Sequence, residues 1–116
     1  MTTSAEIAVE RTGGIVVARL TGEVDMTNAG YIGDELTRAV PNEALGLVVD
    51  LTGTRYLDSA AVELLFELAR RLTRRRQRLS LALPQTSPLR RVLLLTDVET
   101  AAPLFDTVEE ALAASG

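Results

Sequence analysis

The first part of the chain alternates apolar and polar residues in two short runs, a period typical of β-strands with one covered face. The runs lie within residues 6–20 and are joined by Gly13 and Gly14. A two-residue hairpin turn needs positive φ angles, which glycine adopts without steric cost. The pattern therefore predicts an antiparallel β-hairpin.

Helical spacing follows the hairpin. Apolar residues recur every three or four positions between residues 29 and 40, which predicts an amphipathic helix that stops at the proline after it. Thr27 or Asn28 stands where an N-cap is needed. Gly30 and Gly33 each weaken the helix by about 1 kcal/mol relative to alanine. Close packing of the helix on a sheet would explain both glycines.

The middle of the chain combines a buried strand with a strong helix. The unbroken apolar run at 44–51 predicts a central strand covered on both faces, followed by a loop at 52–56. A long amphipathic helix starts at Ser59, and Val62 and Phe66 lie on the shoulder of its apolar stripe. The stripe itself consists of Ala61, Leu64, Leu65, Leu68, Ala69 and Leu72.

The remaining third continues the alternation of strands and helices. Ser87 and Pro88 stand at the N-cap and first position of one helix, and Thr107 and Glu110 have capping-box spacing in the last one. The predicted elements are a strand at 79–83, a helix at 86–95, a strand at 102–105 and a helix at 106–114.

The order of elements is thus ββαβαβαβα within 116 residues. Strands alternating with helices imply parallel pairing through right-handed crossovers. We expect an α/β fold over residues 1–116, a single domain with a mixed, mostly parallel sheet, an N-terminal antiparallel hairpin and helices packed against the sheet.

Composition narrows the chemistry. The chain has no His, no Cys and no Lys, which excludes a Ser-His-Asp unit, a thiolate nucleophile, a His/Cys zinc site and a Walker-type phosphate loop. A net charge of -4 disfavours nucleic-acid binding by the chain as a whole. No segment has the length of a membrane span or a signal peptide. We expect a cytoplasmic protein without a cofactor, and a monomer.

Three stretches together resemble the STAS domains, and within them the bacterial anti-sigma factor antagonists that serine phosphorylation switches. They are "LTGEVDMTNA" after the hairpin, "LVVDLTGTRYLDS" before the second helix, and the tail "RRVLLLTDVETAAPLFDTVEEAL". The second is the most specific, because the family signature is a buried strand ending in Asp, a short loop, and Asp-Ser at a helix start. The resemblance covers nearly the whole chain.

The resemblance implies that Ser59 is the phosphoacceptor, that Asp58 is the acidic residue before it, and that Asp25 lies near the same site. Family members usually follow the acceptor with Ser or Thr and then Gly, whereas this chain has Ala60 and Ala61. Both changes alter the surface that a kinase would contact. The expected partner-binding residues are Asp25, Asp58, Ser59, Ala60, Val62 and Phe66.

The resemblance further implies the partners. The unphosphorylated protein would bind an anti-sigma factor with serine kinase activity, phosphorylation of Ser59 would release it, and a serine phosphatase would reset the switch. Two alternatives stay open: a STAS subunit that binds the ATPase of a lipid-transport ABC system, and a STAS module that binds its partner constitutively without phosphorylation.

Each singled-out residue also has a plain structural interpretation. Ser59 or Asp58 can simply cap the helix. The arginine cluster of Arg70–Arg78 suits the negative end of a helix dipole, although it could contact acidic partners, lipids or nucleic acid. Asp25 and Asp50 form a weak candidate for an acid–base pair or a Mg²⁺ site, because Asp at strand ends commonly caps turns. An enzyme with Ser59 as nucleophile is disfavoured, because nothing visible would activate its hydroxyl.

Overall fold

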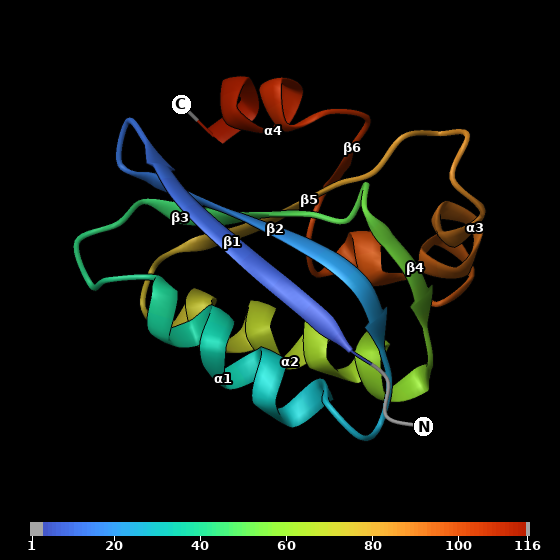
Figure 1. Cartoon of the computed structure of the whole chain (residues 1–116). Coiled ribbons are helices and arrows are strands. Elements are labelled where there is room, and N and C mark those ends of the chain that lie inside the picture. The colour runs from blue at the N-terminus through green and yellow to red at the C-terminus, as the bar shows by residue number, and fades with distance from the viewer. Residues whose placement is uncertain (1–3, 116) are drawn as a thin grey trace.

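A mixed six-stranded sheet runs through the middle of the molecule, with helices on both faces (Figure 1). The computed structural model describes residues 4–115. The strands are β1 (Ala5–Thr12), β2 (Ile15–Val24), β3 (Gly46–Asp50), β4 (Thr54–Leu57), β5 (Arg78–Ala82) and β6 (Leu104–Phe105). The helices are α1 (Ala29–Ala39), α2 (Ser59–Arg74), α3 (Pro88–Leu95), the short 3₁₀ helix η1 (Val98–Thr100) and α4 (Val108–Ser115).

The sheet has the strand order β1-β2-β3-β5-β6, with β4 paired to β2 outside this path. The pair β1/β2 is antiparallel, and every other pair is parallel. Gly13 and Gly14 form the hairpin turn with φ angles of +56° and +86°. The predicted α/β class and the N-terminal hairpin are therefore confirmed.

One strand was not predicted. The stretch expected as a loop contains β4, which pairs with the far end of β2 after β3 has ended at Asp50. Only the first and last residues of β4 are buried, so it lacks the period of two that marks a strand. The register of the β2/β4 pair shifts between Gly22 and Glu23, so Arg55 has no partner residue on β2 and forms a bulge. The guanidinium of Arg55 forms an ion pair with Glu23. The strand exists because β2 extends beyond β3, and no local pattern encodes that.

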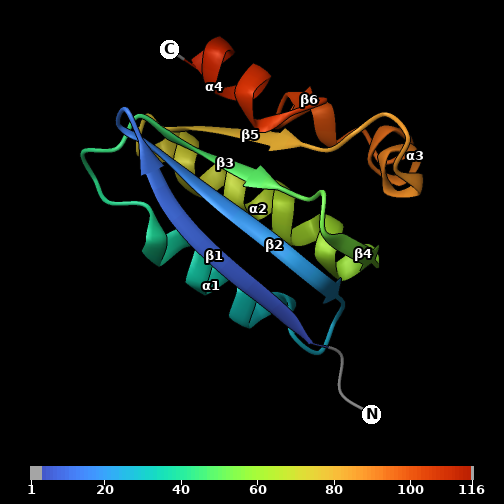
Figure 2. The ribbon, with the colours of Figure 1, turned by 45° about the horizontal axis from the view of Figure 1, so that its top comes forward.

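The helices divide unequally between the two faces of the sheet (Figure 2). Val16, Ala18 and Leu20 of β2 point into the large core, to which α1, α2 and α3 contribute. Ile15 and Val17 point the other way, into a small core closed by α4. Within residues 4–115, no helix is long and apolar enough to cross a lipid bilayer.

Side-chain caps are confirmed at three of the four helix starts for which a cap was predicted, including Asp58 at α2. The Ser87 hydroxyl accepts a hydrogen bond from the Leu89 amide at 3.2 Å. The Thr107 hydroxyl accepts one from the Glu110 amide at 3.1 Å. At α1 Asn28 occupies the N-cap position, as one of the two predicted candidates, but its side chain makes no capping bond. Its carboxamide is used elsewhere in the loop before the helix.

The apolar stripe of α2 is also rotated from the expected one. Val62 was placed on its shoulder, but only 8% of the residue is exposed and it belongs to the large core. Leu64 was placed inside the stripe, but it is half-buried and faces α1. Because α1 packs beside α2, the neighbouring helix decides which side chains are covered.

The two glycines of α1 differ in their surroundings. A Cβ built on Gly33 would lie 3.0 Å from Cδ1 of Leu64, so this glycine allows α1 to approach α2. A Cβ built on Gly30 would have no atom within 4 Å, and Gly30 is exposed. The expected reason, close packing on the sheet, therefore applies to neither glycine. Packing against α2 explains Gly33, and no packing contact explains Gly30.

Gly30→Ala should raise the free energy of unfolding by about 0.5–1 kcal/mol, because alanine has less backbone freedom to lose and fits the open site. Gly46→Ala in β3 is the matched control, since its Cβ would lie 2.5 Å from the carbonyl oxygen of Arg78. This second variant should lower the free energy of unfolding by about 1–3 kcal/mol. Urea unfolding followed by circular dichroism measures both, and a destabilised Gly30→Ala would contradict the first expectation.

Candidate functional site

The register between β2 and β4 brings two distant loops together. Val24, the last residue of β2, pairs in parallel with Leu57, the last residue of β4. The residues that follow, Asp25 and Asp58, therefore leave the same edge of the sheet side by side. The backbone amide of Asp58 also donates to the carbonyl of Val24 at 3.3 Å. The expectation from the family resemblance that Asp25 lies near Asp58 agrees with this geometry.

Asp58 connects the two loops through its side chain. One carboxylate oxygen, Oδ1, accepts a hydrogen bond from the Ala61 amide in the first turn of α2 at 3.1 Å. The other, Oδ2, accepts one from the Met26 amide at 3.1 Å. A single carboxylate thus caps α2 and fixes the position of the loop between β2 and α1.

Asp25 organises its own loop. Its Oδ1 accepts hydrogen bonds from the amide and the hydroxyl of Thr27, at 2.9 and 2.5 Å. Its amide donates to Oδ1 of Asn28 at 3.0 Å, and Nδ2 of Asn28 donates to the carbonyl of Glu23 at 2.9 Å. Asn28 therefore closes the loop instead of capping α1, and Asp25 is half-buried in that loop.

Ser59 is the first residue of α2 and is exposed. Asp58 is the N-cap, so the interpretation of Ser59 as the capping residue is wrong. Within residues 4–115, no hydrogen bond is found for the Ser59 hydroxyl. The backbone amides of Ser59 and Ala60 have no acceptor within the helix, because the first amides of any α-helix lack one. The hydroxyl thus lies at the positive end of the helix dipole.

The other predicted contact residues differ in accessibility. Ala60 is half-buried and faces α1, while Ala61 has 0% of its surface exposed. Phe66 is half-buried and packs against the large core beside the buried Val62. Most of the surface that these two residues were expected to offer is therefore covered by the protein itself.

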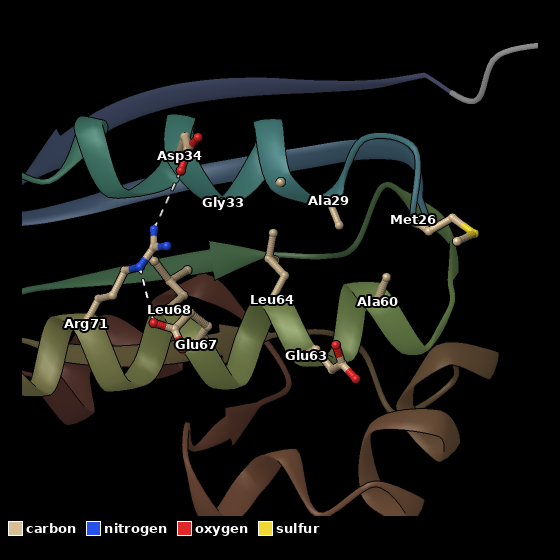
Figure 3. A pocket seen from close by; sticks show the side chains of 11 residues that line it. Met26, Ala29, Gly33, Asp34, Ala60, Glu63, Leu64, Glu67, Leu68 and Arg71 are labelled. Atoms are coloured by element: carbon tan, nitrogen blue, oxygen red, sulfur yellow. Dashed lines mark ion pairs between the residues drawn. The ribbon is translucent and has the colours of Figure 1, made fainter.

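Sequence reasoning missed two exposed residues near the start of α2, Met26 and Glu63. Met26 is 80% exposed and lies with Ala60 and Glu63 at one end of a groove between α1 and α2 (Figure 3). A methionine between Asp25 and Thr27, in a stretch expected to connect a strand to a helix, is the only signal that the sequence offers for this position. Nothing in the sequence places it beside α2, because that depends on the Asp58 hydrogen bond.

Asp50 takes part in a turn. Its Oδ1 accepts hydrogen bonds from the amide and the hydroxyl of Thr52, at 3.0 and 2.6 Å, and its Oδ2 lies 3.6 Å from Nε of Arg19. In the part of the chain that the structure describes, no three His, Cys, Asp or Glu residues are grouped so that they could hold a metal ion. The turn accounts for this aspartate.

The arginine cluster at the C-terminal end of α2 mostly serves the fold. Arg70, Arg71 and Arg74 all form ion pairs with Glu67. The hydrogen bond from Arg70 is the main cause that holds the pKa of the Glu67 carboxyl below its ordinary value. Arg75 donates to the carbonyl of Val40 at 2.7 Å, which ties the end of α2 to the end of α1.

The model of the STAS domain family matches residues 6–111 of the chain. The protein belongs to the STAS domain family. No curated protein matches its sequence significantly. The N-terminal hairpin, the mixed, mostly parallel sheet and the helices packed on it are thus the fold of a STAS domain, as the sequence resemblance implied.

Solved structures agree with this STAS fold. An anti-sigma factor antagonist from Mycobacterium paratuberculosis is 26% identical, with a TM-score of 0.84 over 97% of this chain and 94% of the other. The Bacillus cell fate determinant SpoIIAA in its phosphorylated form is 23% identical, with a TM-score of 0.69 over 96% and 100%. A sulfate transporter family protein from Wolinella succinogenes is 17% identical, with a TM-score of 0.75 over 90% and 86%.

The division of roles between Asp58 and Ser59 gives a stability prediction for this STAS domain. Asp58→Ala should lower the free energy of unfolding by about 1–2 kcal/mol, because the Ala61 and Met26 amides both lose their acceptor. Ser59→Ala should change it by less than about 0.5 kcal/mol, because its hydroxyl is exposed and caps nothing. Chemical denaturation of the two single variants checks this, and equal losses would show that Ser59 shares the capping role.

Proposed function

We propose that this STAS domain is an anti-sigma factor antagonist whose Ser59 is a phosphoacceptor. In its unphosphorylated form it binds an anti-sigma factor through the surface around Ser59, which frees a sigma factor and so regulates transcription. The observation that carries the proposal is the exposed Ser59 hydroxyl, left uncommitted at the start of α2 because Asp58 caps the helix. Similarity to an anti-sigma factor antagonist across nearly the whole chain supports it.

The isolated domain tolerates a phosphate at this position. Phosphorylation adds a charge of about -1.5 to -2. The free amides of Ser59 and Ala60 and the dipole of α2 favour an anion there by about 0.3–2 kcal/mol. The Asp58 bonds to Ala61 and Met26 do not involve the Ser59 hydroxyl, so modification leaves them in place. The fold therefore survives the modification.

A bound partner responds differently. Asp25, Asp58 and Glu63 surround the start of α2 with carboxylates, so the partner surface that fits them is basic or neutral. A phosphate adds further negative charge where docking has excluded water. Two like charges 4 Å apart repel by about 4 kcal/mol at the effective dielectric constant near a protein surface, against about 1 kcal/mol in bulk water. Repulsion among the phosphate, these carboxylates and any acidic group of the partner then lowers affinity without unfolding.

The partner supplies the chemistry. The anti-sigma factor acts as an ATP-dependent serine kinase on Ser59 and dissociates from the product, and a separate serine phosphatase restores the hydroxyl. The STAS domain is the substrate and binding module in this cycle, acting as a cytoplasmic monomer. Asp25, Asp58, Ser59 and Ala60 form the centre of the contact surface, with Phe66 at its edge and Val62 beneath it.

A STAS subunit that binds the ATPase of a lipid-transport ABC system is the competing candidate, and a transport context is represented among the similar structures by a sulfate transporter family protein. That similarity, at 17% identity, concerns the fold alone. Affinity purification of the tagged STAS domain from its own organism separates the candidates. Recovery of a transporter ATPase in place of a sigma-factor regulator would overturn the proposal.

Incubation with the anti-sigma factor kinase of the same organism and ATP should add one phosphate to the wild-type protein and none to Ser59→Ala. Mass spectrometry of the intact protein measures the addition. Unchanged phosphorylation of Ser59→Ala would overturn the assignment of the site.

Ser59→Glu should weaken binding to the same anti-sigma factor by roughly tenfold to a thousandfold, because it adds negative charge beside Asp58. Thr12→Glu is the matched control, since Thr12 is exposed at the hairpin turn, at the opposite end of β2 from the Asp25 loop. Isothermal titration calorimetry compares the two variants. Equal affinities for Ser59→Glu and wild type would remove the electrostatic basis of the switch.

A further inference from the structure

The groove between α1 and α2 begins beside Ser59 and extends along both helices. It has a volume of about 420 Å³. Its lining is apolar where the helices face each other, through Ala29 of α1 and Ala60, Leu64 and Leu68 of α2, and the exposed Met26 lies at its Ser59 end (Figure 3). Methionine side chains are flexible and polarisable, and they are common on binding surfaces that adapt to a partner.

The two ends of this groove differ. At the far end, Nη1 of Arg71 lies 3.7 Å from Oδ1 of Asp34 on α1, and its Nε lies 3.4 Å from Oε1 of Glu67 on α2. The Arg71–Asp34 pair crosses the groove from α2 to α1, while the Arg71–Glu67 pair runs along α2 (Figure 3). At the Ser59 end no such pair crosses it among the described residues. A side chain therefore enters from the Ser59 end.

The charge on the rim favours a basic neighbour. Glu67 is already held by Arg70, Arg71 and Arg74. Glu63, which is exposed at the open end, has no ion-pair partner among residues 4–115. An apolar groove with an uncompensated carboxylate at its mouth complements an apolar side chain that has a cationic residue close by in its own chain.

Gly30 has no structural explanation other than the groove that it lines. Its φ is not positive, and an added Cβ would touch nothing. Gly30 is the second residue of α1, and a glycine there loses more backbone freedom on folding than an alanine would. The absence of a side chain at this position leaves the apolar lining accessible from the α1 side.

We propose that this groove receives a long apolar side chain of the anti-sigma factor, flanked by an arginine or lysine that meets Glu63, and that Gly30 keeps the groove open for it. The inference rests on the proposed function, since it takes the occupant from the same partner. The groove then supplies affinity through apolar burial, while the neighbouring Ser59 supplies control through charge.

Gly30→Leu tests this directly, because leucine fills the groove from α1 without a clash of its Cβ. It should weaken binding of the anti-sigma factor by roughly tenfold to a hundredfold, the range expected when one apolar side chain loses its burial. Tyr31→Leu is the matched control, because it places the same side chain at the next position of α1, which is exposed and does not line the groove. This control should bind as the wild type does.

Met26→Gln is a second variant in case leucine at position 30 disturbs the fold. Met26 is 80% exposed, so its side chain contributes little to folding, and the change removes an apolar contact at the mouth of the groove. It should weaken binding several-fold without a change in melting temperature. The chain has only two methionines, so ¹³C-methyl labelling of methionine gives two signals. The signal of Met26 should shift when the anti-sigma factor binds.

The outcomes separate the two proposals. If Ser59→Glu weakens binding but Gly30→Leu and Met26→Gln bind like wild type, the groove inference is wrong and the proposed function stands. If the anti-sigma factor binds and none of these variants changes its affinity, the binding surface lies elsewhere and both fail. Concentration-dependent self-association that Gly30→Leu abolishes would make a second copy the occupant and would overturn the inference. Absence of any binding by the wild type would refute both.

Discussion

The carboxylate of Asp58 holds the Ser59 end of this STAS domain together, because its two oxygens accept hydrogen bonds from the amides of Ala61 and Met26. The first bond satisfies the start of α2, and the second fixes a loop that lies more than thirty residues earlier in the chain. Both depend on a carboxylate with two acceptors in one plane, which a serine cannot replace. With capping assigned to Asp58, the Ser59 hydroxyl is free for another role.

This separation of roles explains how one helix start can be stabilised and still leave a hydroxyl available for the proposed regulation. Asp58, which stabilises the fold, is half-buried and accepts hydrogen bonds from two segments of the chain, while the hydroxyl of the adjacent Ser59 is exposed and has no hydrogen bond among residues 4–115. A modification of Ser59 would therefore affect a partner bound at this surface and leave the fold intact. The groove that begins next to it adds apolar area to a site that would otherwise consist of carboxylates and one hydroxyl.

Features that were predictable from the sequence are mostly local ones. Gly13 and Gly14 specify the hairpin turn by their backbone freedom. Ser87 followed by Pro88 specifies the start of α3, and the capping bond joins Ser87 to Leu89, only two residues further on. In each case, the residues that carry the signal also make the contact. The order of the elements and the STAS motifs then led to the correct fold.

Features that were missed depend on neighbours distant in sequence. Strand β4 forms only because β2 extends beyond β3, and Leu64 is left partly uncovered because α1 packs beside it with a glycine facing it. The carboxamide of Asn28 is drawn away from α1 by Glu23 and Asp25. Met26 gains its place beside Ser59 through one hydrogen bond, so no property of its own residue type could reveal it.

The in-register pair of Val24 and Leu57 also restricts how the length of this chain can change over evolution. One inserted residue in an extended strand moves everything after it by about 3.3 Å and turns its side chain to the opposite face. An insertion before Met26 or Asp58 would therefore separate the amide from its acceptor. The hairpin turn at the other end of β2 is exposed, and it does not have to hold an amide against the Asp58 carboxylate. Insertions and deletions among descendants of this sequence should therefore accumulate at the turn and be rare at the Ser59 end.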